Sequence, residues 1–494
     1  MKPFSILSLF AGLMLGTLVA HAAPDRTRPN FILIMVDDMG YSDIGCYGGE
    51  VKTPNLDKLA GQGTKLEQCY AASPNCSPAR TGMLTGRSPY RVGMYDFARF
   101  KPLHIPEAET TVAELLKSAG YQTLFAGKWH CSGDFDSGTQ PDPGDHGFDH
   151  WFAHPKNFGK DAKGFVRNGK KVDRAEGWMA EVVVDEAIDW LDKQKESNQP
   201  FFTCLWFSEP HTPVLAANEF RELYPDSKTG PFLKSLYQSG GPQVKRRAKL
   251  KDPDLYFGCI SMLDHHIGRL MNYLDQHGLS QNTLIVFTSD NGPEHRTATA
   301  FGSSGDLRGA KGHIHEGGIR VPGIVRWPNR IRAGQVSQEP VNGTDWLPSF
   351  SAVAEVEVPT VKPVDGANLL PALLGDGEVN REIPMMWWLW HARGGYEVAM
   401  RHGDYKMLAT LLPQQKPGDF SDASQPKGWS VMKFIKETEL GRFELFNLAA
   451  DRAETKNLAT SDPERFEMLK KKMVASHREI RAEGPVYELS HKKK

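Results

Sequence analysis

The segment NFILIMVDD, from Asn30 to Asp38, is a continuous apolar run that ends abruptly in two carboxylates. A strand with one exposed face alternates polar and apolar residues, whereas this run has no polar position between Phe31 and Val36. Such a run is typical of a strand that is buried on both faces of a parallel sheet. The segment therefore predicts a central strand of an α/β fold, with Asp37 and Asp38 at its carboxyl end.

The same alternation of helix and strand recurs along the chain. Helical periodicity predicts helices over residues 110–119, 181–195 and 255–277, and apolar runs predict strands over residues 121–126, 200–207 and 283–288. Strands joined by helices of this length form βαβ units. We therefore expect a large, mainly parallel mixed sheet flanked by helices, in a domain that spans residues 23–380.

Polar residues follow each of the four predicted strands. After Asp37 and Asp38, these are Lys128 and His130, Glu209 and His211, and Asp290 and Asn291. In open α/β sheets, ligands bind at the carboxyl ends of the strands. The sequence therefore predicts that these side chains share one site.

The pattern changes near residue 384. Short segments at residues 385–390, 396–400, 405–408 and 443–448 predict antiparallel strands, and residues 463–482 predict a charged amphipathic helix. We therefore expect a smaller C-terminal α+β subdomain over residues 381–494, built on an antiparallel sheet.

The composition of the 494-residue chain, 40% hydrophobic and 24% charged, is typical of a globular protein with a large core. Lys and Arg total 59 against 60 for Asp and Glu, so no overall positive charge is available to neutralise nucleic-acid phosphates. We therefore expect no nucleic-acid partner. Six scattered cysteines without a C-x-x-C pair exclude a disulfide framework, although up to three bridges remain open.

Residues 1–22 have the pattern of a secretory signal peptide. Met1 and Lys2 precede an apolar run at residues 6–20, and Ala20-His21-Ala22 fits a signal peptidase site. The alternative, a transmembrane anchor, needs roughly twenty apolar residues. We therefore expect an exported protein, periplasmic or secreted, with no membrane span in the mature chain.

The segment CSPARTGMLTGR, from Cys76 to Arg87, matches the pattern C-x-P-x-R followed by T-G. It resembles the signature of type I sulfatases of the alkaline phosphatase superfamily, whose cysteine is oxidised to formylglycine. The resemblance implies that Cys76 is modified by a formylglycine-generating maturation enzyme, leaving at most two disulfide bridges. The alternative for a lone cysteine is a buried free thiol. One departure is Ala79, where the family often has serine.

Further motifs resemble the family in the same order along nearly the whole mature chain. They are GKWH at residues 127–130, EPHTP at 209–213, FTSDNG at 287–292, LRGAKG at 307–312, EGGIRVP at 316–322 and LFNL at 445–448. His313 and His315 precede Glu316 where the family has other residues, so the resemblance implies no role for them.

The resemblance implies a calcium site, since carboxylate and amide oxygens suit calcium better than zinc. Its ligands would be Asp37, Asp38, Asp290, Asn291 and the modified Cys76. The alternative for Asp37 and Asp38 alone is a turn or helix cap after a strand.

The resemblance also implies roles in sulfate-ester cleavage. Hydrated formylglycine at position 76 would attack sulfur, and Arg80, Lys128 and His130 would hold it, with His130 as the base. His211 and Lys311 would contact the sulfate and the leaving oxygen, with His211 as the general acid because imidazole titrates near neutral pH. Lys128, His211 and Lys311 are thus the expected substrate-binding residues.

These observations predict a sulfatase that acts on a sulfated carbohydrate or an aryl sulfate. Two alternatives stay open: a phosphonate or phosphate-ester hydrolase of the same superfamily, and an inactive carbohydrate-binding relative. The basic run at residues 245–251 is a second candidate contact for a sulfated polysaccharide. Candidate pocket residues are Tyr95, Arg99, His104 and His146. The sugar and the oligomeric state are not predicted.

Overall fold

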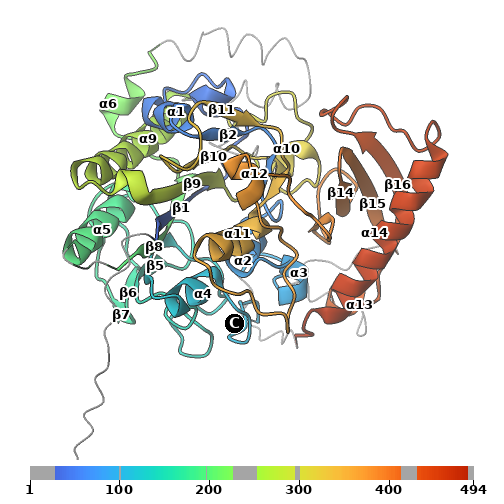
Figure 1. Ribbon diagram of the computed structural model, residues 1–494, viewed down its shortest axis with the longest axis horizontal. Helices are drawn as coiled ribbons and strands as arrows, with labels where there is room; N and C mark the ends of the chain where they lie inside the picture. Colours follow the sequence, from blue (N-terminus) through green and yellow to red (C-terminus); the bar gives the residue numbers. More distant parts are fainter. Residues whose placement is uncertain are drawn as a thin grey trace, which may run out of the picture.

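The computed structural model describes residues 28–98, 102–195, 197, 199–225, 253–294, 301–412 and 431–487. The predicted signal peptide, the basic run at 245–251 and Arg99 lie outside these residues. β1 (Asn30–Asp37) is buried along its whole length within a sheet of ten described strands, ordered β11-β2-β10-β9-β1-β8-β4-β5-β6-β7 (Figure 1). The buried central strand predicted from the apolar run is confirmed.

The centre of the large sheet is parallel. β1 pairs in parallel with β8 (Phe201–Pro210) and β9 (Thr283–Ser289), and β4 (Gln122–Lys128) pairs in parallel with β8 and with β5 (His150–His154). The sheet is mixed because β10 (Gly323–Arg326) runs antiparallel to β9 and to β2 (Thr64–Leu66). The short edge strands of this sheet are β6 (Val166–Arg167), β7 (Lys170–Lys171) and β11 (Gln335–Ser337). β3 (Cys69–Tyr70) and β12 (Val341–Asn342) form a separate two-stranded parallel sheet.

Helices cover both faces of this sheet, which explains why β1 has no polar face. Phe31, Leu33 and Met35 belong to one apolar core, and the alternate residues Ile32 and Ile34 belong to another. The first core is covered by α2 (Cys76–Thr85), α3 (Pro89–Val92), α4 (Val112–Ser118) and α11 (Trp346–Val353). The second is covered by α1 (Pro54–Gly61), α5 (Met179–Gln194) and α9 (Pro253–Gln276).

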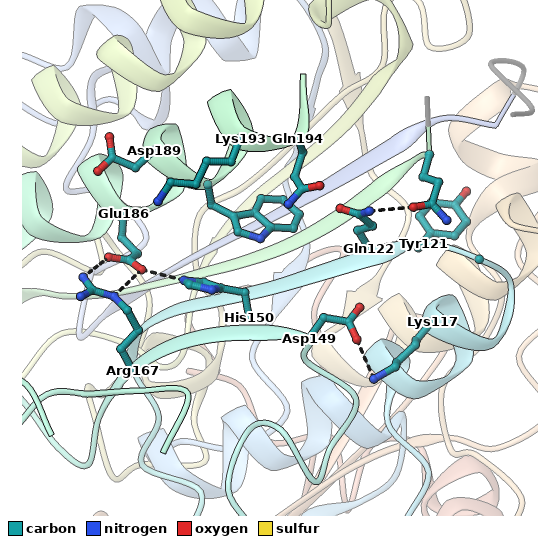
Figure 2. Close-up of a pocket in the computed structure, with 13 residues that line it drawn as sticks. Lys117, Tyr121, Gln122, Asp149, His150, Arg167, Glu186, Asp189, Lys193 and Gln194 are labelled. Carbon is teal, nitrogen blue, oxygen red and sulfur yellow. Dashed lines mark hydrogen bonds and ion pairs between the residues drawn. The ribbon is translucent and has the colours of Figure 1, made fainter. Parts of the chain in front are cut away.

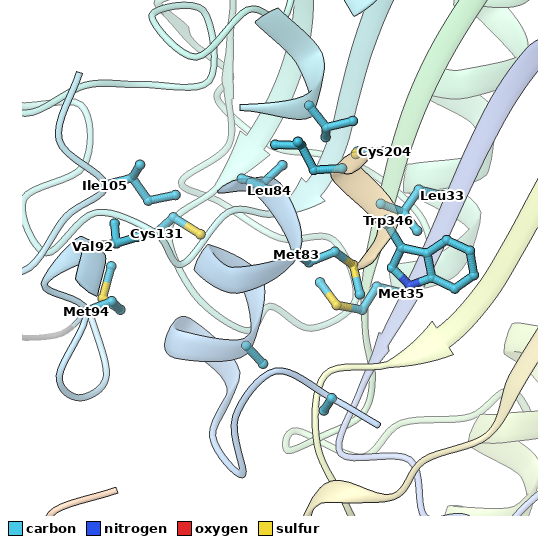
Figure 3. Close-up of a cluster of buried hydrophobic side chains, with 14 of the residues drawn as sticks. Leu33, Met35, Met83, Leu84, Val92, Met94, Ile105, Cys131, Cys204 and Trp346 are labelled. Carbon is cyan, nitrogen blue, oxygen red and sulfur yellow. The ribbon is translucent and has the colours of Figure 1, made fainter. Parts of the chain in front are cut away.

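The first core anchors α2, the helix that begins at Cys76. Met83 and Leu84 of α2 lie in the same apolar cluster as Leu33 and Met35 of β1 and Trp346 of α11 (Figure 3). Each of these side chains is at most 2% exposed. The buried end of α2 therefore fixes the position of its first residue.

A separate antiparallel sheet forms the C-terminal part of the chain, as predicted. It consists of β13 (Met385–Trp388), β14 (Val398–His402), β15 (Tyr405–Leu412) and β16 (Glu439–Asn447), with α14 (Pro463–Glu483) alongside (Figure 1).

The remaining α-helices of the described residues are α6 (Asn218–Arg221), α10 (Glu316–Ile319), α12 (Leu370–Leu374) and α13 (Val431–Glu437). None of the helices in the described ranges is long and apolar enough to cross a membrane. The domain boundary at residues 380 and 381 stays a prediction.

A buried ion cluster joins the C-terminal sheet to α10. Lys406 Nζ of β15 lies 2.9 Å from Glu316 Oε1 of α10 and 3.0 Å from Glu454 Oε1, and all three side chains are fully buried. Glu454 Oε2 also accepts a hydrogen bond from the Glu316 backbone N–H at 2.7 Å. Burial and the neighbouring Glu316 raise the pKa of Glu454 to about 7, although Lys406 opposes this shift. The cluster therefore holds a carboxyl group that titrates near neutral pH.

We expect the Glu454→Gln variant to lose less thermal stability than the unmodified protein as the pH rises from mildly acidic to mildly alkaline. The folded-state pKa of Glu454 is raised, so its contribution to stability is present below its ordinary pKa of 4.5 and is lost as the pH rises through about 7. Glutamine has the shape of the protonated form and does not titrate. Melting temperatures across this pH range measure the effect. The control is Glu437→Gln on the exposed face of α13, and parallel pH profiles for the two variants would contradict the prediction.

Candidate active site

The carboxyl ends of four neighbouring strands meet at one edge of the large sheet. β9, β1, β8 and β4 are adjacent in that order. Asp37 is the last residue of β1 and Lys128 the last residue of β4, while Asp290 and His211 directly follow β9 and β8. Because these strands are parallel, the four polar ends come together as the sequence predicts.

Cys76 is the first residue of α2 and is only 1% exposed. Its Sγ lies 3.4 Å from Nδ1 of His130, which follows β4. Burial raises the pKa of the Cys76 thiol, so the thiol is neutral near pH 7. Burial, together with Lys128 and Arg80, holds the pKa of His130 well below its ordinary value. The ring of His130 is therefore a neutral base beside position 76.

Arg80 lies one helical turn after Cys76 and is fully buried. Its Nε and Nη2 donate hydrogen bonds to Asp290 Oδ2 at 3.0 and 2.7 Å, and its Nη1 donates to the carbonyl oxygen of Lys128 at 3.0 Å. The guanidinium also lies 5.1 Å from the centre of the Trp206 ring. Arg80 therefore ties the helix that carries Cys76 to the ends of β9 and β4.

Three buried carboxylates lie among buried cations. Lys128 Nζ donates to Asp37 Oδ2, and Lys311 Nζ lies 2.6 Å from Asp38 Oδ1. Burial alone would raise the pKa of Asp37, but Lys128, His211 and Arg80 hold it well below its ordinary value. Burial and the nearby Asp37 raise the pKa of Asp290 to about 6.

Three oxygens in this cluster lack hydrogen-bond partners among the described residues. They are Asp37 Oδ1, Asp38 Oδ2 and Asn291 Oδ1, all buried. Asn291 Nδ2 donates to Asp38 Oδ1 at 2.6 Å, which holds the two side chains against each other. Ligand atoms of Asp37, Cys76 and Asp290 lie within 4.8 Å of one another, as do those of Asp37, Asp38 and His211. Buried oxygens without partners are costly, so this donor set fits a hard divalent cation.

His211 lies at the more open side of the cluster. Its Nε2 is 3.6 Å from Asp38 Oδ2, and its side chain is 23% exposed, compared with 4% for Lys311. Its Nδ1 lies 2.8 Å from the carbonyl oxygen of Thr212, which fixes the orientation of the ring. His211 therefore stands between the buried ions and solvent.

Two residues at this site carry no sequence motif and were not predicted. Asn157, after β5, donates from Nδ2 to Asp37 Oδ2 at 2.8 Å. The ring centre of Phe97 lies 6.4 Å from that of His130 and 6.0 Å from Lys311 Nζ. Both residues are in irregular loops, where periodicity gives no signal, and β5 itself was not predicted.

Two of the candidate pocket residues are buried and hydrogen-bonded to backbone outside the cluster at the strand ends, and their place in a pocket stays a prediction. Tyr95 is buried, and its hydroxyl donates to the carbonyl oxygen of Pro485 at 2.6 Å. His146 is buried against Trp129, with Nε2 3.2 Å from the carbonyl oxygen of Ile105. His104 lies beside Tyr487, with 6.2 Å between the ring centres. A polar ring can be buried wherever one backbone hydrogen-bond partner is available. Residue type alone therefore does not distinguish a buried ring from one that lines a pocket.

The cysteines form no bridges: all six are free thiols, and all except Cys46 are buried. The structure therefore contains none of the disulfides that the cysteine count left open.

A cavity of about 830 Å³ lies at the opposite end of the same strands. Its lining includes Gln122 at the start of β4 and His150 at the start of β5 (Figure 2). Glu186 is paired there with both His150 and Arg167, at 2.7 and 2.5 Å. None of the described metal-ligating groups lies in this cavity. The candidate metal-ligating groups of the described residues lie instead at the carboxyl ends of the strands.

Comparisons with known proteins agree with this geometry. A family model described as Sulfatase matches residues 29–356. The N-acetylgalactosamine-6-sulfatase of Canis lupus familiaris is 32% identical over 425 residues, which cover 80% of this chain and 74% of the relative. Arylsulfatase A of Homo sapiens is 32% identical over 436 residues, which cover 81% and 77%. The crystal structure of Ps i-CgsB in complex with k-i-k-neocarrahexaose has a TM-score of 0.72 and 27% identity, covering 91% of this chain and 94% of that one.

Proposed function

Since this chain belongs to the sulfatase family and is a sulfuric ester hydrolase, we propose that it removes sulfate from a sulfated carbohydrate, with a formylglycine made from Cys76 and a bound calcium ion. The observation that carries the proposal is the cluster at the strand ends. There, Cys76 begins a buried helix beside His130, and three buried oxygens lack partners. The similarity to N-acetylgalactosamine-6-sulfatase supports a sulfated sugar as the substrate.

Asp37, Asp38, Asp290 and Asn291 are the proposed protein ligands of calcium, with the modified side chain at position 76. The unpartnered oxygens of Asp37, Asp38 and Asn291 support this assignment. When bound, calcium would stabilise negative charge on the sulfate oxygens. Arg80 holds Asp290 in place through two hydrogen bonds to Oδ2, and Oδ1 accepts a hydrogen bond from the backbone N–H of Asp38 at 3.3 Å.

Formylglycine, once hydrated, would supply the hydroxyl that attacks sulfur. We assign His130 as the base that holds a proton taken from the hydrated group at position 76. Its Nδ1 lies 3.4 Å from Cys76 Sγ, and its lowered pKa keeps the ring neutral and able to accept a proton. Lys128 and Arg80 keep positive charge beside this position, with Lys128 on Asp37 and Arg80 on Asp290.

His211 and Lys311 are the proposed contacts of the sulfate and the leaving oxygen. Lys311 carries a raised pKa because Asp38 and its neighbours outweigh the effect of burial, so its ammonium group stays charged and attracts the anionic ester. Nε2 of His211 lies at the open side, where a leaving alcohol would exit. We therefore assign His211 as the general acid that protonates the leaving oxygen.

A comparison of substrates tests the proposed reaction. We expect the matured enzyme to hydrolyse 4-nitrophenyl sulfate with a higher kcat/KM than 4-nitrophenyl phosphate diesters or phenylphosphonates. The measurement is kcat/KM on each of these esters with one enzyme preparation. Negligible sulfate turnover with rapid phosphonate or diester turnover would instead support the ester-hydrolase alternative. No turnover of any of these esters would support the inactive carbohydrate-binding alternative.

Peptide mass spectrometry across Cys76 provides the control for this test. Conversion of cysteine to formylglycine lowers the peptide mass by about 18 Da. Only a preparation that shows this change counts as matured. The protein must therefore be expressed in a host with an active formylglycine-generating enzyme. We propose this enzyme as the partner in maturation. We also propose that the signal at residues 1–22 directs export of the protein to a periplasmic or secreted location.

A further inference from the structure

Asn157 reaches the cluster at the strand ends from the connection that follows β5. Its Nδ2 donates to Asp37 Oδ2 at 2.8 Å, and Lys128 Nζ donates to the same oxygen. The other carboxylate oxygen of Asp37, Oδ1, is buried and has no hydrogen-bond partner among the described residues. Both donors therefore occupy one oxygen of Asp37 and leave the other available to a cation.

The two donors on Asp37 Oδ2 differ in charge. Lys128 is a cation that compensates the charge of the carboxylate, whereas the amide of Asn157 is neutral. The amide can therefore fix the orientation of the carboxylate without cancelling the negative charge that attracts a cation. Residues that hold a metal ligand in place in this way contribute strongly to metal affinity, although they do not touch the metal.

The backbone is held on both sides of Asn157, which itself lies outside any helix or strand. The carbonyl oxygen of the preceding residue, Lys156, lies 2.6 Å from His154 Nδ1. The N–H of the following residue, Phe158, donates to Ser208 Oγ of β8 at 3.3 Å. The place of the Asn157 amide thus depends on one contact with β5 and one with β8.

His154 is the last residue of β5 and is 5% exposed. Its carbonyl oxygen accepts a hydrogen bond from the Trp129 N–H at 2.8 Å, which fixes its backbone beside the end of β4. Its ring lies between two carbonyl oxygens of the connection, with Nδ1 2.6 Å from that of Lys156 and Nε2 3.1 Å from that of Lys163. The ring therefore fastens both ends of the segment that carries Asn157.

Packing fixes the position of the His154 ring. Its centre lies 5.3 Å from that of Phe158 and 5.1 Å from that of Phe165. A Cβ at Gly164 would lie 3.2 Å from His154 Nε2, and Gly164 has a φ of +94°. The chain thus has glycine where the connection closes over the ring, so the ring nitrogens keep their place beside the two carbonyl groups.

We propose that His154 is a positioning residue for the calcium site, which acts through Asn157 by holding its amide on Asp37. This inference rests on the proposed function, because Asp37 is one of the proposed calcium ligands. The path runs from the ring of His154 through the Lys156 carbonyl to the Asn157 amide. Loss of the ring nitrogens should release this amide and with it the fixed orientation of Asp37 Oδ1.

The test is a double-mutant cycle on calcium affinity. The measurement is the Kd of calcium from calorimetric titration of the chelator-treated full chain, so it does not depend on turnover. All variants are made in one host, so that position 76 is in the same state. We expect Asn157→Ala to raise the Kd roughly 10- to 100-fold, as for loss of a residue that holds a metal ligand. His154→Phe keeps the aromatic packing but removes both ring nitrogens, and should raise the Kd roughly 10-fold.

The double variant distinguishes positioning from a separate effect. If His154 acts through Asn157, adding His154→Phe to Asn157→Ala should weaken calcium binding no further. His154→Asn, which keeps an amide near the position of Nδ1, should recover part of the affinity that His154→Phe loses. It also replaces His154→Phe in the cycle if that variant does not fold, which melting temperatures without calcium show.

The control is His150→Phe, the same substitution at the opposite end of β5. His150 pairs there with Glu186 in the cavity of Figure 2, with Nε2 2.7 Å from Oε1. This variant loses an ion pair in the same strand but should keep the calcium Kd of the unmodified protein.

Three results would overturn the assignment. An unchanged Kd in both His154 variants, even with a lower melting temperature, would mean that His154 is important only for stability. Losses that multiply in the double variant would mean that His154 acts independently of Asn157. Equal losses in His150→Phe and His154→Phe would mean that any change in β5 disturbs the site. Failure of the proposed function is distinguishable, because the unmodified protein would then bind no calcium or, once matured, hydrolyse no sulfate ester.

Discussion

Replacement of Cys76 by alanine is expected to lower kcat/KM on 4-nitrophenyl sulfate by roughly 10⁴-fold or more, as for loss of a covalent nucleophile. Alanine cannot be converted to formylglycine, so the attacking hydroxyl is never made. The fold should persist, because Cys76 is a small side chain beside His130, and Met83 and Leu84 anchor the other end of α2. Initial rates on purified protein, with a thermal melt to show folding, measure the effect.

The matched control is Cys204→Ala, the same substitution at another buried thiol. Cys204 lies in the middle of β8, in the apolar core away from the strand ends. Its loss leaves a small cavity, which lowers stability but removes no reacting group. We therefore expect the control to keep its rate per folded molecule. Activity of Cys76→Ala close to that of Cys204→Ala would contradict the role of position 76.

Calcium is expected to stabilise the fold, with a gain of about 2.7 kcal/mol in the free energy of unfolding when calcium is at 100 times its Kd. The reason is the set of buried oxygens without partners on Asp37, Asp38 and Asn291. The measurement is the melting temperature of chelator-treated protein on titration with calcium or magnesium. The larger rise should occur with calcium, which accepts more oxygen ligands in a flexible geometry. This readout does not depend on turnover.

Asp38→Asn should weaken the calcium-dependent rise, because it removes one negative charge from the proposed ligand set. The comparison is the change in melting temperature with calcium, not the melting temperature itself, since Asp38 also pairs with Lys311. The control is Asp185→Asn on α5, whose carboxylate is half exposed and paired with Arg269. The proposed calcium site would be contradicted if calcium did not change the melting temperature of the unmodified protein. It would also be contradicted if calcium raised the melting temperatures of both variants equally.

The elements that could be predicted are those whose signal lies within a short segment. The apolar run of β1 predicted a strand buried on both faces, and helical periodicity predicted α4, α5 and α9 to within a few residues. The short strands β2 and β10 were not predicted, because segments of three or four residues are too brief for periodicity. They are also antiparallel to each other, which makes the large sheet mixed.

The residues of the site likewise divide into those at predictable strand ends and those in irregular loops. Asp38 and Asn291 were predicted to meet because each follows a strand of one parallel sheet, and their side chains are hydrogen-bonded across 253 positions of sequence. Asn157 and Phe97 reach the same site from irregular loops that carry no repeat or motif. Tyr95 is as polar as a pocket residue yet lies in the core, where Pro485 supplies its hydrogen-bond partner.

The sequence by itself determined the buried parallel strands, the polar residues at their ends and the sulfatase motifs, because each of these depends on neighbours along the chain. Only the tertiary structure decided which loops border the site. His391 and Asp96 are separated by almost 300 residues, and their contact exists because the antiparallel sheet packs against the catalytic domain through Lys406, Glu316 and Glu454. Packing between distant segments depends on the shape and charge of both surfaces together, and no local pattern in either segment encodes it.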